Sequence, residues 1–143
     1  MSPAARTAPS YISELAPLLQ ENGLLAEQVL IVAAGVHNKT LTDDEVVAAW
    51  RNDLTPLAEH IRNHADLTEV PIEWSARHVG LVDVWSDRAE AYRALTEALA
   101  DGDRDSWRVA RGVADEVKLR EQRWFTDVNE ELKPMGITLD QYP

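Results

Sequence analysis

Two charged residues occupy positions where the helical spacing of the sequence calls for apolar ones. Arg88 lies three residues after Trp85 on one apolar seam, and Glu121 lies three residues before Trp124 on another. Counting from the predicted turns places Asn22 near the same level of the first helix. Burying a polar group costs free energy unless the group is paired. The sequence therefore predicts an Arg–Glu–Asn layer across the middle of a helical protein.

This layer has two interpretations. It is either a buried ion pair that fixes the register of the helices, or a polar anchor for a small ligand in an otherwise apolar pocket. All five tryptophans lie on or beside the apolar seams, so their indoles either fill a core or form the wall of a cavity. The candidate ligand-binding residues are Arg88, Glu121, Asn22, Trp85 and Trp124.

A group of histidines is predicted at one end of the same helices. His60 and His64 are spaced i, i+4, His78 follows across a short turn, and Asp127 of the last helix reaches the same end. Imidazole and carboxylate groups suit Zn, Cu, Ni or Fe, so these four residues could bind a divalent transition metal. The alternative is that they are hydrogen-bonded residues at the edge of the core, with no metal or other cofactor.

Several kinds of chemistry are excluded by what the sequence lacks. It contains no cysteine, which removes thiolate catalysis and disulfides. It has no glycine-rich phosphate loop, no GxSxG, HExxH or EF-hand motif, and no Glu-x-x-His pair of the di-iron bundles. The sequence thus favours a non-enzymatic protein, and the alternative is a metal-binding bundle, with or without catalytic activity.

The charge balance excludes two classes of partner. The chain of 143 residues has 25 acidic and 14 basic residues, a net charge of −11. Phosphate backbones and anionic lipids repel such a protein, so neither nucleic acid nor membrane is expected as a partner. Arg104, Arg108 and Arg111 share a helix face, but aspartates interleave with them, which indicates a solvated ion-pair face. We expect a soluble cytoplasmic protein, or an exported one whose signal has been removed.

The elements that position these residues are helices. Apolar spacings of three and four dominate, and breaks fall after His37, at Asp66–Pro71 and at Gly102. They leave four helices of matched length, roughly 25–31 residues each, which predicts an antiparallel up-down-up-down four-helix bundle. The bundle spans residues 11–134, between a disordered tail (1–10) and a C-terminal tail (135–143). Pro56 predicts a kink in the second helix.

One apolar excess remains on the first helix. Leu30 points away from the predicted core direction and Ile31 lies near its edge, and a helix that is apolar on more than one stripe often faces a partner. We therefore expect a protein partner or a homodimer through this helix, or a small ligand bound elsewhere in the bundle.

Overall fold

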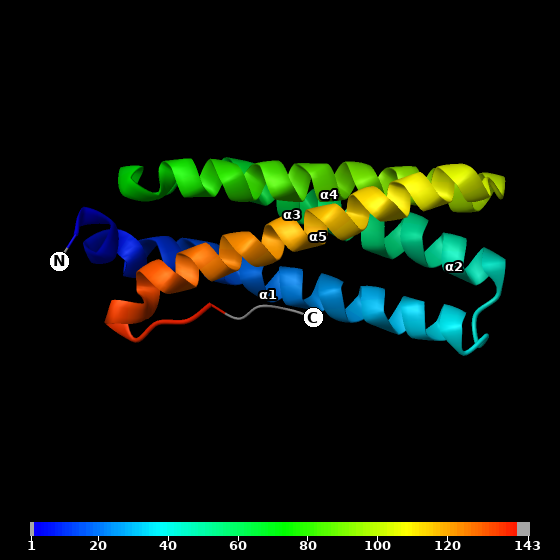
Figure 1. Ribbon diagram of the computed structural model, residues 1–143, viewed down its shortest axis with the longest axis horizontal. Helices are drawn as coiled ribbons and strands as arrows, with labels where there is room; N and C mark the ends of the chain where they lie inside the picture. Colours follow the sequence, from blue (N-terminus) through cyan, green and yellow to red (C-terminus); the bar gives the residue numbers. More distant parts are fainter. Residues whose placement is uncertain (1, 140–143) are drawn as a thin grey trace.

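The computed structural model describes residues 2–139, and within that range every regular element is helical, which confirms the all-α fold class. In Figure 1 the helices lie along the length of the molecule. None of the helices in the described range combines the length and apolar character needed to cross a bilayer. The elements are α1 (Pro3–His37), α2 (Asp43–Ala49), a π-helix (Trp50–Leu54), α3 (Thr55–Leu67), a 3-10 helix (Ile72–Trp74), α4 (Ser75–Asp101), α5 (Arg104–Leu132) and a 3-10 helix (Lys133–Met135).

The helix ends follow the capping signals of the sequence. Thr42 accepts a hydrogen bond from the backbone N–H of Glu45 at 3.2 Å, and its own N–H donates to the Glu45 carboxylate at 3.0 Å. Gly102 ends α4 with a left-handed φ of 66°, and Asp103 caps α5 by accepting from the Ser106 N–H at 3.1 Å. Both turns lie at one end of the molecule, here called the turn end, and the opposite end is called the closed end (Figure 1).

The N-terminal segment differs from the prediction, because residues 3–10 are helical and not a disordered tail. Ser2 caps the helix by accepting from the Ala5 N–H at 3.1 Å, and Pro3 stands in the first turn, where a missing N–H is harmless. Ala8 is completely buried. The first turns of α1 therefore belong to the core of the closed end.

The C-terminal segment packs back onto α5 as far as Leu139. The Leu139 N–H donates to Asn129 Oδ1 at 2.7 Å, and Asn129 Nδ2 donates to the Leu139 carbonyl at 2.9 Å. Leu139 is buried, so part of the predicted tail is attached to the bundle. The remainder of that predicted tail, residues 140–143, lies outside the described residues.

Pro56 distorts the second helical segment without ending it. Proline has no N–H to donate back along the helix, and just before it the turn widens into the π-helix Trp50–Leu54, where the Thr55 N–H donates to the Trp50 carbonyl. The hydroxyls of Thr55 and Thr96 form a buried hydrogen bond of 3.1 Å, which attaches this point to α4. The predicted kink is thus a π-turn.

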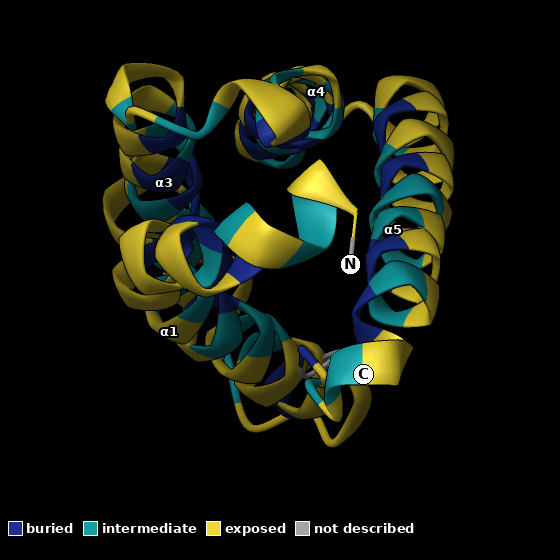
Figure 2. Ribbon diagram, turned by 90° about the vertical axis from the view of Figure 1, so that its left-hand side faces the viewer, coloured by how far each residue is buried: buried dark blue, intermediate teal, exposed yellow. Residues whose placement is uncertain are grey.

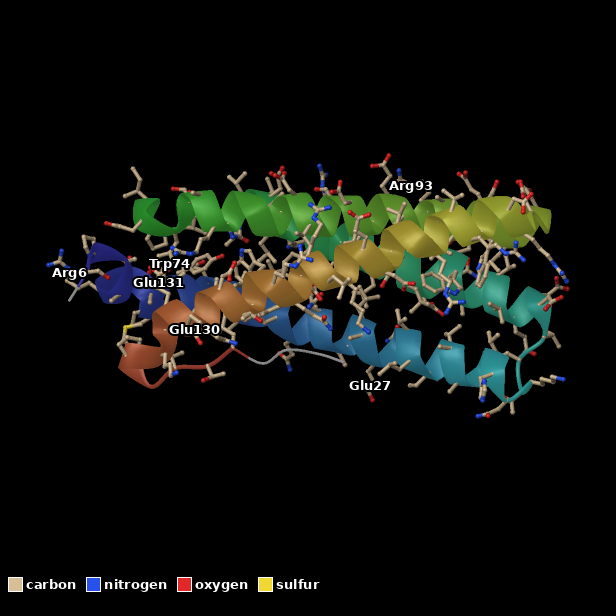
Figure 3. The ribbon with its side chains drawn as sticks, in the orientation of Figure 1. Arg6, Glu27, Trp74, Arg93, Glu130 and Glu131 are labelled. Carbon is tan, nitrogen blue, oxygen red and sulfur yellow. The ribbon has the colours of Figure 1, made fainter. Side chains whose placement is uncertain are left out.

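Large side chains fill the closed end. Trp74 stacks on Tyr11 with ring centroids 5.0 Å apart, and its indole N–H donates to the Ala4 carbonyl at 2.9 Å. Figure 2 looks onto this end and shows the buried residues facing the space between the helices, and Figure 3 places Trp74 beside the start of α1. At the turn end, by contrast, α4 and α5 bury the small side chains of Ala98 and Ala110. Small side chains let two helices approach closely but fill little volume.

We predict that two glycines respond in opposite ways to alanine. A Cβ on Gly35 would lie 2.5 Å from Leu41 Cδ1, whereas a Cβ on Gly112 would meet nothing within 4 Å. Gly112→Ala should therefore stabilise the protein by about 0.5–1 kcal/mol, because alanine is the better helix former. Gly35→Ala should destabilise it by about 1–3 kcal/mol, the usual cost of overpacking. Urea unfolding of both variants measures the difference, and equal gains would show that Leu41 moves aside freely.

Candidate functional site

The polar layer predicted from the sequence is present at the middle of the molecule. Arg88 Nη1 donates to Asn22 Oδ1 at 2.6 Å and to Glu121 Oε2 at 3.0 Å. The same carboxylate oxygen accepts from the Trp85 indole N–H at 2.7 Å and from Asn22 Nδ2 at 3.4 Å. We call Asn22, Trp85, Arg88 and Glu121 the waist cluster. It joins α1, α4 and α5 at one level.

The guanidinium of Arg88 has unused hydrogen-bond capacity. Arg88 is only 8% exposed, and its Nε and Nη2 atoms are buried without a hydrogen-bond partner. Both of the contacts to Asn22 and Glu121 use the other nitrogen, Nη1. A buried donor left unpaired costs about 1–3 kcal/mol, and native structures contain few of them. An acceptor that paired with these donors would remove that cost.

A groove of about 930 Å³ extends from the waist cluster to the turn end. It lies between α1 and α5, with α4 and the α2 segment forming the rest of its wall. Figure 1 shows α1 and α5 wide apart at the turn end and crossing toward the closed end. The α4 wall runs from Arg88 to Gly102, which is roughly 21 Å at the rise of an α-helix. The volume falls within the ~300–1,000 Å³ of small-molecule sites.

Aromatic and aliphatic side chains form most of the groove wall. The π-turn of the second segment places the Trp50 ring edge-to-face with Tyr92, at a centroid distance of 4.9 Å. Leu30 reaches the groove from α1 and is 46% exposed, and Trp107 reaches it from α5 with the Arg111 guanidinium 5.2 Å from its ring. Burial raises the pKa of the Tyr92 phenol above its usual value. This wall is suited to an apolar ligand.

The charge of the groove differs from that of the whole protein. Its lining includes five of the 14 basic residues but only four of the 25 acidic ones. Arg104 and Arg111, which the sequence assigned to a solvated ion-pair face, both line it. The groove is therefore the part of an acidic molecule where basic groups are in slight excess. The basic residues are Lys39, Arg88, Arg104, Arg111 and Lys118.

Four of the five predicted ligand-binding residues form two groups at the waist, and the fifth lies apart from them. Arg88 and Glu121 line the groove at its inner end, and Asn22 and Trp85 are buried behind them and hold them in place. Trp124 belongs to neither group. Its indole N–H donates to a carbonyl of α4 at 2.8 Å, and it is not part of the groove wall.

The sequence left open whether the tryptophans fill a core or form the wall of a cavity, and the structure contains both kinds. Trp74 and Trp85 are completely buried, whereas Trp50 and Trp107 line the groove. The apolar excess at Leu30 was the useful signal, because Leu30 lines the groove. Ile31, assigned to the same surface, is 62% exposed and lies outside the groove wall.

The four predicted metal ligands do not form a metal site. His78 is buried, and both of its ring nitrogens are engaged: Nδ1 bonds the Tyr11 hydroxyl at 3.0 Å, and Nε2 donates to the Ala65 carbonyl at 2.7 Å. His78 therefore connects α1, α3 and α4 in the core. Within residues 2–139 no three His, Cys, Asp or Glu side chains are grouped so that they could hold a metal ion. The metal prediction fails because seam spacing does not reveal hydrogen bonds to a neighbouring backbone.

The remaining predicted ligands are on the surface. His60 and His64 stack with ring centroids 4.1 Å apart, and His60 Nε2 lies 3.1 Å from Glu21 Oε2 of α1. Asp127 is exposed on α5, and its neighbour Glu131 pairs with Arg77. These contacts join pairs of helices and bring no further ligand to the histidine pair.

Comparison of the chain with protein-family models, curated proteins and solved structures found no match. The fold and the site define an all-α protein with an internal groove that ends at a buried arginine. Its function must be inferred from that geometry.

We predict that Glu121→Leu destabilises the protein by about 3–5 kcal/mol, because it leaves the buried Arg88 charge without its carboxylate. Adding Arg88→Met should recover most of this loss, since an apolar replacement of a whole buried pair is often close to neutral. Chemical unfolding of the two variants measures both values.

The matched control is an exposed ion pair between α3 and α4, whose arginine lies on the same helix as Arg88. Arg93 Nη2 lies 2.7 Å from Glu59 Oε1, and Figure 3 shows Arg93 pointing away from the bundle. Glu59→Leu should cost at most about 1 kcal/mol, as exposed ion pairs do. Equal effects of Glu59→Leu and Glu121→Leu would contradict the importance of the waist cluster.

We predict a loss of stability at high pH that depends on two tyrosines. Burial raises the pKa of both Tyr11 and Tyr92 above the usual value. Above pH ~10 these phenols ionise in the unfolded chain while they stay protonated in the native one. The unfolded state then binds fewer protons, so stability falls as pH rises. In thermal melts above pH ~10, the melting temperature should fall less steeply with pH in Tyr92→Phe and Tyr11→Phe than in the natural protein. The same slope in all three proteins would contradict the role of these two tyrosines.

Proposed function

We propose that this protein is a non-enzymatic helical bundle that binds a small apolar ligand in the groove. The bundle is taken as the antiparallel up-down-up-down arrangement that the sequence predicts, with α1 and α5 diverging toward the turn end. One observation carries the proposal: an apolar groove of about 930 Å³ ends at a buried arginine with two unpaired donors. Apolar walls with a few converging polar groups are typical of ligand sites.

Binding is a better account of this site than catalysis. The Glu121 carboxylate already accepts from Arg88, Trp85 and Asn22. All three donors contact Oε2, so this oxygen already holds the guanidinium, the indole and the Asn22 amide in place. The same contacts hold the Arg88 side chain in a fixed position, which suits recognition of a ligand group.

A protein partner is the second candidate, and it uses a different surface. Leu24 and Ile31 are 50% and 62% exposed, and their spacing of seven residues places them on one face of α1. Exposed apolar residues that recur along a helix face are typical of contact surfaces. We propose self-association through this face as the alternative to a groove ligand.

Neighbouring substitutions separate the two candidates. Leu30 lines the groove and Ile31 does not. Leu30→Glu therefore places a negative charge in the groove wall, and Ile31→Glu places the same charge outside it. Titration with Nile red, an uncharged apolar dye, should show one site in the natural protein. Leu30→Glu should weaken binding by about tenfold or more, because an apolar ligand would cover an unpaired carboxylate. Ile31→Glu should bind the dye normally.

Other outcomes would count against the groove. If both variants still bind the dye, the groove is not the binding site. If the natural protein and Ile31→Glu do not bind the dye, the proposed groove site is also rejected. Light scattering of the same three proteins tests the alternative. A dimer that dissociates in Ile31→Glu and persists in Leu30→Glu supports self-association through the outer face, and a monomer at high concentration rejects it.

A further inference from the structure

The two unpaired donors of Arg88 form one edge of its guanidinium group. Because Nη1 makes both contacts to Asn22 and Glu121, the unpaired atoms are Nε and Nη2. Nε–H and the adjacent Nη2–H point in nearly the same direction, and this fork matches the two oxygens of a carboxylate. A lysine at this position would offer a point charge instead.

The fork and the groove together select an amphiphile. Arg88 lies at the inner end of the wall, and the aromatic rings of Trp50 and Tyr92 lie between it and the turn end. A ligand that placed a polar head on Arg88 would extend its apolar body along roughly 21 Å of α4. Nε and Nη2 are closed to water, so a head group reaches them only if side chains at the inner end of the groove move.

The charges of the groove favour an anionic head. Arg88 and Glu121 neutralise each other, and the rest of the lining adds Lys39, Arg104, Arg111 and Lys118 against three aspartates. A cationic head would meet both this excess and the guanidinium itself. An anion gains charge-assisted hydrogen bonds, which are stronger than those of a neutral acceptor.

We infer that the ligand is an amphiphilic monocarboxylate, whose carboxylate pairs with the Nε–Nη2 edge of Arg88 and whose apolar chain occupies the groove. This inference rests on the proposed function, and it adds the chemical class of the ligand. Glu121 and Asn22 act as positioning residues, because they hold the guanidinium so that the fork remains free.

The test compares three ligands that share one chain and differ in the head group. Dodecanoate, dodecanol and dodecylamine are titrated into the full chain by calorimetry at neutral pH, below the concentrations at which they form micelles. Tryptophan fluorescence gives a second readout, because Trp50 and Trp107 line the groove. Dodecanoate should bind about tenfold or more tighter than dodecanol, given the strength of hydrogen bonds to charged groups, and dodecylamine should bind weakest.

Two variants assign the preference to the fork. Arg88→Met alone would leave the half-buried Glu121 carboxylate without its ionic partner, so the informative protein is the double variant Arg88→Met with Glu121→Leu. It should bind dodecanoate no better than dodecanol, and the ratio of the two affinities is the quantity compared with the natural protein. Arg93→Met, which removes an exposed arginine of the same helix, should keep the full preference for the acid.

Each of the other results rejects one part of this inference: the carboxylate head group, Arg88 as its anchor, or the groove itself. Equal binding of dodecanoate and dodecanol to the natural protein rejects the carboxylate while the groove stands, and a preference for dodecylamine does the same. A preference for the acid that survives in the double variant rejects Arg88 as the anchor. If none of the three ligands binds and Nile red does not bind either, the proposed function fails together with this inference.

Discussion

The buried charge of Arg88 is the constraint on which the rest of the structure depends. A guanidinium in a core of low dielectric is costly unless partners surround it. Its hydrogen-bond partners are Asn22 of α1 and Glu121 of α5, and the Trp85 ring of α4 lies with its centroid 5.6 Å from the guanidinium carbon. These contacts can form at only one register of the three helices. The waist cluster therefore fixes where α1 and α5 meet, and consequently where they begin to diverge.

The two ends of the molecule differ because different side chains lie on either side of this cluster. Toward the closed end, Tyr11, Trp74 and Phe125 are fully buried, and His78 satisfies its polar atoms within the core. Toward the turn end the buried positions of α4 and α5 hold small side chains such as Ala98 and Ala110. These helices approach each other there, and the groove lies between them and α1. Large side chains thus fill the core between the waist cluster and the closed end, and the groove lies between the waist cluster and the turn end.

The sequence is informative about spacing along each helix and uninformative about the space between helices. Capping signals at Thr42 and Asp103 correctly place two helix starts, and the polar seam positions correctly pair Arg88 with Glu121. The sequence left an apolar pocket as one of two interpretations, and it could not give the place or width of the groove, because these depend on how far α1 and α5 diverge. The metal site was wrongly predicted because periodicity places His78 on an inner face and says nothing about the Ala65 carbonyl that binds it.

The π-turn in the second segment divides one helix into two halves with different roles. Proline at position 56 removes one backbone donor, and the widened turn Trp50–Leu54 absorbs that loss. On one side of it, α3 contributes Ile61 and Ala65 to the closed core. On the other side, α2 contributes Val46 and Val47 to the groove wall. The hydrogen bond from Thr55 to Thr96 attaches the junction of the two halves to α4. One distorted helix therefore contributes to the closed core on one side of the π-helix and to the groove wall on the other.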